Sequence, residues 1–164
     1  MDSVIQSVRL RPPRNQLNRR SVAWWRTQIG LITVVPMLAA AALGALAAPG
    51  FFVLAGVFAV IGTAVAVILP AWWYRVHRWE VTDTAVYTRS GYFWQEWRIA
   101  PMSRIQTVDT VRGPLQQVFR LATVTVTTAS AKGAVQIKGL DAELAATLAD
   151  ELTETTQATP GDAT

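Results

Sequence analysis

The sequence predicts a two-helix transmembrane hairpin followed by a small β-sandwich or partly open barrel that is capped by a C-terminal helix. Three observations predict this fold class. The chain of 164 residues is 51% hydrophobic, and residues 27–74 contain no Asp, Glu, Lys, Arg or His. After this uncharged stretch the apolar residues alternate as in strands, and near residue 141 their period changes to that of a helix. This pattern excludes an ordinary soluble globular protein and a disordered one.

The uncharged stretch, residues 27–74, divides into two helices at Pro49-Gly50. Residues 27–48 and 51–74 would be about 33 and 36 Å long as helices, enough to cross a hydrocarbon core of roughly 30 Å. So short a turn forces the two helices into an antiparallel hairpin. Small residues recur at four-residue spacing, which either reflects helix composition or allows close helix packing; they are Ala40, Gly44, Ala48, Gly62 and Ala66.

The flanks of the hairpin predict its orientation. The basic arm, residues 1–26, carries six Arg and one Asp, and the turn between the helices is uncharged. Cationic flanks stay in the cytoplasm, so we expect a multi-pass protein of the inner or plasma membrane with both termini cytoplasmic. The residues expected at the membrane interface, where the arginines would meet anionic headgroups, are Arg19, Arg20, Trp24, Trp25, Arg26, Trp72, Trp73, Arg75 and Arg78.

An alternative interpretation of the arm is a twin-arginine export signal. Arg19-Arg20 precedes the apolar stretch, and Ala45-Leu46-Ala47 has the spacing of small residues that a signal peptidase requires. Against it, Arg26 interrupts the approach to an apolar segment that is long enough to span the membrane. Export would place the C-terminal domain on the opposite side of the membrane.

The C-terminal domain, residues 75–155, is predicted to contain short strands and one helix. Asp141 can cap the helix, in which Leu144, Leu148 and Leu152 form an apolar stripe. The polar tail, residues 156–164, is predicted to be disordered. The strands are predicted from alternating or β-branched segments at 79–83, 85–89, 93–99, 106–111, 121–128 and 135–137.

Residues 77–152 resemble the pleckstrin-homology-like (PH-like) domain of small bacterial membrane proteins. The resemblance covers a turn glycine, a Pro-x-x-Arg-Ile-Gln segment, a turn with its following strand, and a Leu-rich closing helix. The family also places two membrane helices and a basic arm ahead of the domain, as here. The residues that carry the resemblance are Gly91, Pro101, Arg104, Ile105, Gln106, Leu115, Phe119, Leu121, Ala122, Val124, Val126, Thr128 and Ala129.

Two departures from the wider family pattern limit what the resemblance implies. Arg120 stands where the family commonly has Gly; if that position requires a positive φ, Arg120 is strained or the turn differs. The first hairpin loop, Thr82-Asp83-Thr84, contains an acid and no base. Phosphoinositide specificity, which needs several Lys or Arg in this loop of eukaryotic PH domains, is therefore not implied.

The residue inventory predicts no catalytic, cofactor-binding or metal site. The chain has no Cys and a single histidine, His77, so the usual metal ligands and acid–base pairs are missing. The strand carboxylates fit a solvated surface, and the sequence contains no phosphate-binding glycine motif. The tryptophans of the arm fit a membrane interface better than a base-stacking surface, so no nucleic-acid partner is expected.

These observations favour a non-enzymatic membrane protein that presents a protein-interaction or assembly domain at the cytoplasmic membrane surface. Trp94, Glu96 and Arg98 share one predicted strand face, which is either a solvated surface or part of a patch for a protein partner or a second copy of the chain. The alternative function is lipid binding or lipid sensing, with the mouth of the barrel facing the bilayer.

Overall fold

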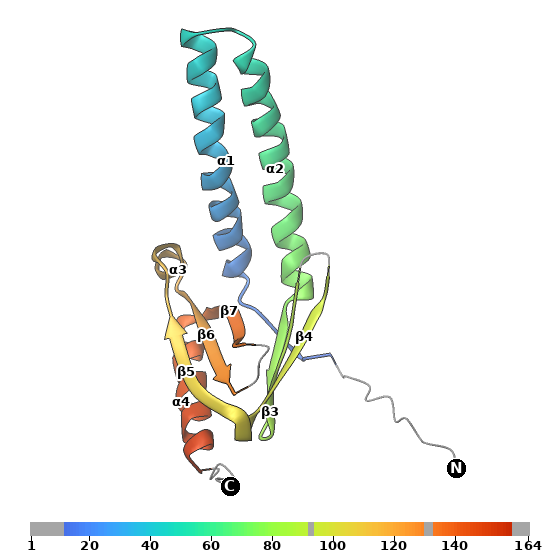
Figure 1. The fold of residues 1–164 in the computed structure, drawn as a ribbon, viewed down its shortest axis with the longest axis vertical. Coiled ribbons are helices and arrows are strands. Elements are labelled where there is room, and N and C mark those ends of the chain that lie inside the picture. The colour runs from blue at the N-terminus through green and yellow to red at the C-terminus, as the bar shows by residue number, and fades with distance from the viewer. Residues whose placement is uncertain (1–11, 92–93, 130–132, 159–164) are drawn as a thin grey trace, which may run out of the picture.

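The computed structural model describes residues 12–91, 94–129 and 133–158. A hairpin of two long helices, α1 (Arg20–Leu46) and α2 (Phe51–Val76), stands on a small domain of strands and helices (Figure 1). Both helices are long and apolar enough to cross a membrane, and nearly all of their most apolar stretches are exposed in the structure. A core helix of a soluble protein would be buried there, so this surface fits a lipid environment.

Close packing of the hairpin uses the small residues seen in the sequence. A Cβ atom on Gly62 would lie 2.8 Å from the Cβ of Thr33, and one on Gly44 would lie 3.0 Å from the ring of Phe52. Ala40 is also buried. A side chain at either glycine would therefore crowd a side chain of the other helix, as the packing interpretation of these residues expects.

The first sheet is antiparallel, with the order β1-β2-β3-β4. It contains β1 (Asn15–Gln16), β2 (Arg78–Val81), β3 (Ala85–Ser90) and β4 (Glu96–Pro101). The strand predicted over residues 93–99 begins at Glu96 in the described part of the chain, and Phe93 lies outside the described residues.

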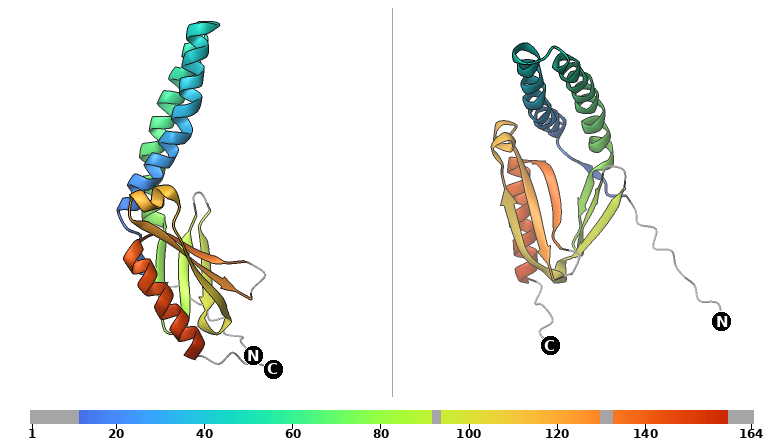
Figure 2. Two further views of the ribbon diagram at one scale, coloured as in Figure 1. Left: turned by 90° about the vertical axis from the view of Figure 1, so that its left-hand side faces the viewer. Right: turned by 45° about the horizontal axis from the view of Figure 1, so that its top comes forward.

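The second sheet is antiparallel, with the order β5-β6-β7, and it packs against the first to form an open sandwich (Figure 2). Its strands are β5 (Ile105–Val111), β6 (Leu121–Thr128) and β7 (Val135–Asp141). A 3-10 turn, η1 (Met102–Arg104), connects the sheets, and a short helix, α3 (Pro114–Val118), connects β5 to β6. The closing helix, α4 (Ala142–Ala158), covers the second sheet.

The cap of α4 agrees with the prediction, but its buried stripe does not. Asp141 Oδ1 accepts a hydrogen bond of 3.1 Å from the backbone N–H of Glu143. Leu148 and Leu152 are buried, whereas Leu144 is 45% exposed and Ala145 takes its place in the core. The prediction for Leu144 was wrong because the core lies along positions 145, 148 and 152, and Leu144 is turned about 100° away from Ala145.

Both ends of the hairpin are built into the domain. The basic arm was expected to precede the fold as a separate segment, yet β1 pairs with β2 and Leu17 joins the hydrophobic core. Helix α1 begins at Arg20 rather than at Thr27, and its first turns carry Trp24 and Trp25 into the same core. At the other end, α2 continues almost directly into β2. Helix α4 likewise continues to Ala158, three residues into the predicted disordered tail.

Candidate functional site

A groove of about 1050 Å³ opens between the end of α2 and the edges of the two sheets. One wall is the last turns of α2, a second is the turn between β3 and β4, and a third is β7. Figure 1 shows the two sheets separated on the side of the domain that carries the hairpin. The lining residues come from α1, α2, β3, β4 and β7 and include Trp25, Leu69, Trp73, His77, Thr88, Trp94, Glu96, Arg98, Gln136 and Lys138.

The α2 wall is aromatic and apolar. Leu69, Trp73 and His77 follow one another at four-residue spacing, so they lie on one face of the helix. Trp25 of α1 packs edge-on against Trp73, with ring centroids 5.6 Å apart, and its ring centroid is also 5.6 Å from that of His77. The tight contacts between these rings give the groove a fixed aromatic wall at the point where the hairpin meets the domain.

The sheet walls supply the polar groups. Arg98 forms an ion pair of 2.8 Å with Glu96 and donates a hydrogen bond of 2.9 Å to the carbonyl of Ala134. The ion pair lies within β4, and the bond to Ala134 holds β4 beside the start of β7. Lys138 is exposed, and within the described part of the chain no carboxylate lies within ion-pair distance of it.

His77 does not add to the positive charge of the groove near neutral pH. Its pKa is lowered below 6.5, first because burial disfavours the charged form and also because Lys138 repels it. A contact of 2.9 Å between Nδ1 and the carbonyl of Trp73 opposes this shift. The groove therefore joins an apolar aromatic wall to the exposed ammonium group of Lys138, an arrangement that can accommodate an anionic amphiphile.

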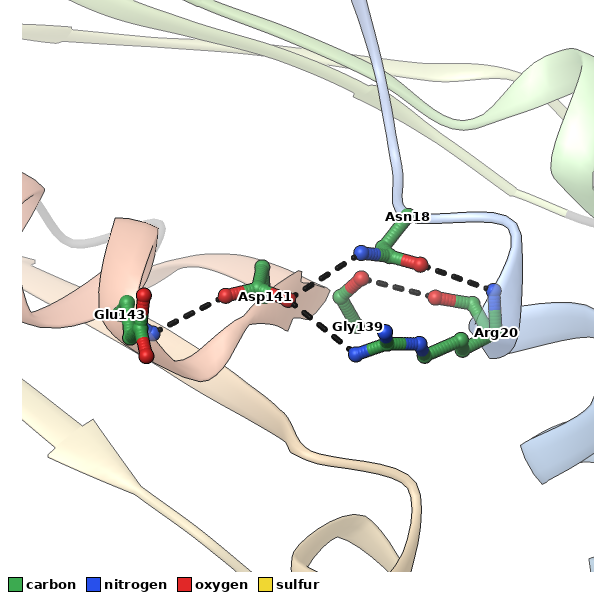
Figure 3. Close-up of polar contacts among 6 residues, drawn as sticks. Asn18, Arg20, Gly139, Asp141 and Glu143 are labelled. Atoms are coloured by element: carbon green, nitrogen blue, oxygen red, sulfur yellow. Dashed lines mark hydrogen bonds and ion pairs between the residues drawn. The ribbon is translucent and has the colours of Figure 1, made fainter.

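The start of α1 is tied to the end of β7 by a polar cluster (Figure 3). Ser21 Oγ, which is buried, donates a hydrogen bond of 2.7 Å to the carbonyl of Gly139. Arg20 lies 3.5 Å from Asp141, and Asn18 Nδ2 donates a bond of 3.4 Å to the same carboxylate. Asp141 thus caps α4 and holds the beginning of α1, so β7, the wall that carries Lys138, is fixed to the hairpin.

The residues expected at the membrane interface lie in different environments. Trp24 and Trp25 are buried in the domain core, Trp73 is half-buried in the groove, and Trp72 is 55% exposed. Arg20 pairs with Asp141, and Arg78 lies in β2. The remaining arginines of this set are exposed at the base of the hairpin; they are Arg19, Arg26 and Arg75.

The residues expected to form a partner surface lie together at the rim of the groove. Trp94 precedes β4 rather than belonging to it and is 86% exposed. Glu96 and Arg98 follow it on the strand and form the ion pair described above. Sequence reasoning missed Leu69 and Lys138. Alternation with the buried Val135 and Ile137 places Lys138 on the exposed face of its strand, but no local pattern shows that this face meets α2.

The comparisons with known proteins agree with this architecture. The sequence model of the family described as "Bacterial PH domain" matches residues 28–156, which include the hairpin as well as the domain. The transmembrane protein YdbS of Bacillus subtilis (strain 168) is 32% identical over 156 residues, covering 92% of this chain and 97% of that protein. No solved structure matches the chain. The chain is therefore a membrane protein that belongs to the bacterial PH domain family.

Proposed function

We propose that this protein is a non-enzymatic, multi-pass protein of the cell membrane whose PH domain binds an anionic lipid of the cytoplasmic leaflet. The observation that carries the proposal is the continuity of the groove. Its lining includes both Leu69, on the apolar surface of α2, and Lys138, on β7 of the domain. One amphipathic molecule in the groove can therefore contact both the apolar helix and the cation.

The dimensions of the groove match those of a lipid at the membrane surface. From Leu69 to His77 the α2 wall rises about 12 Å. The headgroup layer of a bilayer is roughly 5–8 Å thick on each side, so this wall is long enough to extend from the hydrocarbon region through the headgroups. An acyl chain beside Leu69 would remain in the hydrocarbon region while the phosphate reached Lys138. The rings of Trp73 and Trp94 would lie between them, at the depth that tryptophan prefers.

A protein partner is the second candidate, and one observation favours it. Trp94 is 86% exposed at the rim of the groove, beside the ion pair of Glu96 and Arg98. Exposed Trp and Arg side chains are the residues that most often dominate binding energy in protein interfaces. The two candidates differ in what Lys138 does, because a contact with a protein through Trp94 does not require the cation of Lys138.

The proposal requires the domain to face the cytoplasm, with both termini on that side. Because the chain has no native Cys, single substitutions Ala48→Cys in the turn and Ser103→Cys in η1 report the side directly. With a membrane-impermeant maleimide, we expect intact cells to be labelled at position 48 and labelling at position 103 to require permeabilised cells. Labelling at position 103 of intact cells would reverse the topology and support export of the domain.

The lipid proposal predicts that Lys138→Gln weakens binding of anionic lipid by about 5-fold, since a cation near the membrane surface contributes about 1 kcal/mol. The matched control is Arg104→Gln, which removes the same charge from an exposed position in η1, outside the groove. The full-length protein in nanodiscs of neutral lipid would be titrated with phosphatidylglycerol, with tryptophan fluorescence as the signal.

The control separates a local effect of Lys138 from a general effect of net charge. We expect Arg104→Gln to bind the anionic lipid as the wild type does. Equal losses in the two variants would mean that the lipid responds only to net charge. An unchanged affinity in Lys138→Gln, together with loss of a protein partner in Trp94→Ala, would replace the lipid proposal by the protein-interaction function.

A further inference from the structure

Helix α3 lies at the level where the hairpin leaves the domain. It connects β5 to β6 at the end of the sheet nearest the hairpin, beside the start of α1 (Figures 1 and 2). Residues 20–26 of α1 precede the uncharged stretch that begins at Thr27, and they correspond to about 10 Å of helix. Because α3 packs beside this part of α1, it lies close to the headgroup layer on the domain side of the membrane.

The turn that contains α3 is held in place by hydrogen bonds of Gln116 and by packing against the hydrophobic core. Gln116 is buried; its Oε1 accepts a hydrogen bond of 2.9 Å from the N–H of Gly113, and its Nε2 donates one of 2.8 Å to Thr123 Oγ1. Leu115 and Phe119, one helical turn apart, pack against the hydrophobic core. The side chains on the remaining face of α3 are therefore presented from a fixed position.

The exposed side chains in and around α3 include two valines and two arginines. Val118 is 75% exposed and Val111 is 56% exposed, although valine gains free energy when it is buried. Arg112 and Arg120, which flank α3 in the sequence, are also exposed, and the sequence contains no Asp or Glu between Asp109 and Asp141. We call these four residues the α3 tip.

Arg120 occupies a backbone conformation that favours glycine. Its φ is +54°, and its N–H and carbonyl are both engaged, with the carbonyl of Gln117 at 3.1 Å and the N–H of Ala142 at 3.1 Å. A side chain at this position is strained relative to glycine. An arginine that contacts an anionic surface would offset this strain.

We infer that the α3 tip is a membrane-contact surface that inserts Val118 among the headgroups and places Arg112 and Arg120 on anionic phosphates. The occupant is the bilayer that already surrounds α1. The exposed valines match its apolar component, and the two exposed arginines, with no Asp or Glu near them in the sequence, match its anionic headgroups. With the hairpin, the α3 tip fixes the tilt of the domain on the leaflet. The inference does not depend on a ligand in the groove.

Site-specific fluorescence tests this contact, because the chain has no native Cys. The full-length protein carrying Val118→Cys would be labelled with an environment-sensitive fluorophore and placed in nanodiscs that contain phosphatidylglycerol. The control is Ser103→Cys, exposed in η1 at the end of the domain away from the hairpin (Figure 1). We expect iodide quenching at position 118 to be at least 3-fold weaker than at position 103, and spin-labelled lipid headgroups to quench only position 118.

Two outcomes would overturn the inference. Equal iodide quenching at positions 118 and 103 would show that the α3 tip faces water. Protection from iodide without quenching by the spin-labelled lipids would show that protein, such as a second copy of the chain, covers the tip. Lys138→Gln in the same background should leave the lipid quenching unchanged, so failure of the groove proposal and failure of this inference give different results.

Arg120→Gly provides a second measurement with opposite effects on stability and on membrane contact. The glycine relieves the positive φ, so the melting temperature in detergent should rise by about 5 °C. Lipid quenching of the probe at position 118 should nevertheless fall in anionic nanodiscs, because one cation is lost. The variant Arg120→Gln, which keeps the strain and removes the charge, should lose the lipid contact without the gain in stability. If either variant left the lipid quenching unchanged, Arg120 would have no part in the contact.

Discussion

Replacing Leu148 with Asp is expected to unfold the PH domain while the hairpin stays in the membrane. Leu148 is 5% exposed and packs in the core with Ala145 and Leu152. Losing its burial costs roughly 1.5–3 kcal/mol, and an unpaired buried carboxylate adds a desolvation cost of similar or larger size. Domains of this size have roughly 5–15 kcal/mol of stability, so little or none would remain. Limited proteolysis of membrane fractions would show cleavage after Val76.

Leu144→Asp is the matched control, because Leu144 lies on the same helix and is 45% exposed. The new carboxylate stays hydrated there, and we expect a cost of no more than about 1 kcal/mol and a domain that resists protease. Equal protease sensitivity in the two variants would show that α4 is sensitive to any added charge. Full resistance of Leu148→Asp would show that α4 is not docked on the second sheet.

Replacing Gly139 with Ala is expected to break the connection between the hairpin and the domain. Gly139 has a φ of +80°, and a Cβ at this position would collide with Ser21 Oγ. The strain of a left-handed residue is about 1–2 kcal/mol, and loss of the buried bond from Ser21 to the carbonyl of Gly139 adds roughly 1–3 kcal/mol. In a domain of this size the melting temperature should fall by about 10–20 °C, measured by tryptophan fluorescence in detergent.

Gly133→Ala separates backbone strain from the collision. Gly133 also has a positive φ, +78°, but among the described residues no atom other than those of its chain neighbours lies within 4 Å of a Cβ built on it. We expect this control to lose only the part of the stability that is due to strain, roughly a third to a half of the effect at Gly139. If both variants lost the same stability, the contact with Ser21 would add nothing, and the hairpin would not be coupled to β7 through Gly139.

The parts of the fold that sequence patterns predicted are those that depend on local spacing. The uncharged stretch predicted both helices of the hairpin, because a helix that crosses the hydrocarbon core needs about 20 consecutive apolar residues. The β-branched alternation of residues 121–128 gave β6 with the same bounds, and Asp141 was identified as the cap of α4 from its position before the apolar stripe. Arg120 was singled out as a departure from a glycine, and its φ is indeed positive.

The parts that the sequence did not predict depend on contacts between distant residues. Strand β1 has two residues and pairs with β2 across the whole hairpin, so no periodicity reveals it. Trp24 and Trp25 have the composition of an interfacial belt, yet the start of α1 packs into the domain core. Leu144 was assigned to the core because periodicity identifies an apolar stripe without fixing which of two adjacent positions faces the sheet. The groove itself combines five elements, and only the assembled fold brings Lys138 and Leu69 to the same groove.

Cross-linking with a photoactivatable anionic phospholipid tests the central claim most directly. The reactive group would be carried near the headgroup, and the full-length protein would be cross-linked in nanodiscs and mapped by mass spectrometry. Binding in the groove predicts cross-links in two separate segments. One is residues 69–77, at the end of α2, and the other is residues 134–138, at the start of β7. Lys138→Gln should reduce the cross-links in the second segment. Cross-links confined to the lipid-facing surface of α1 and α2, with none in β7, would contradict it.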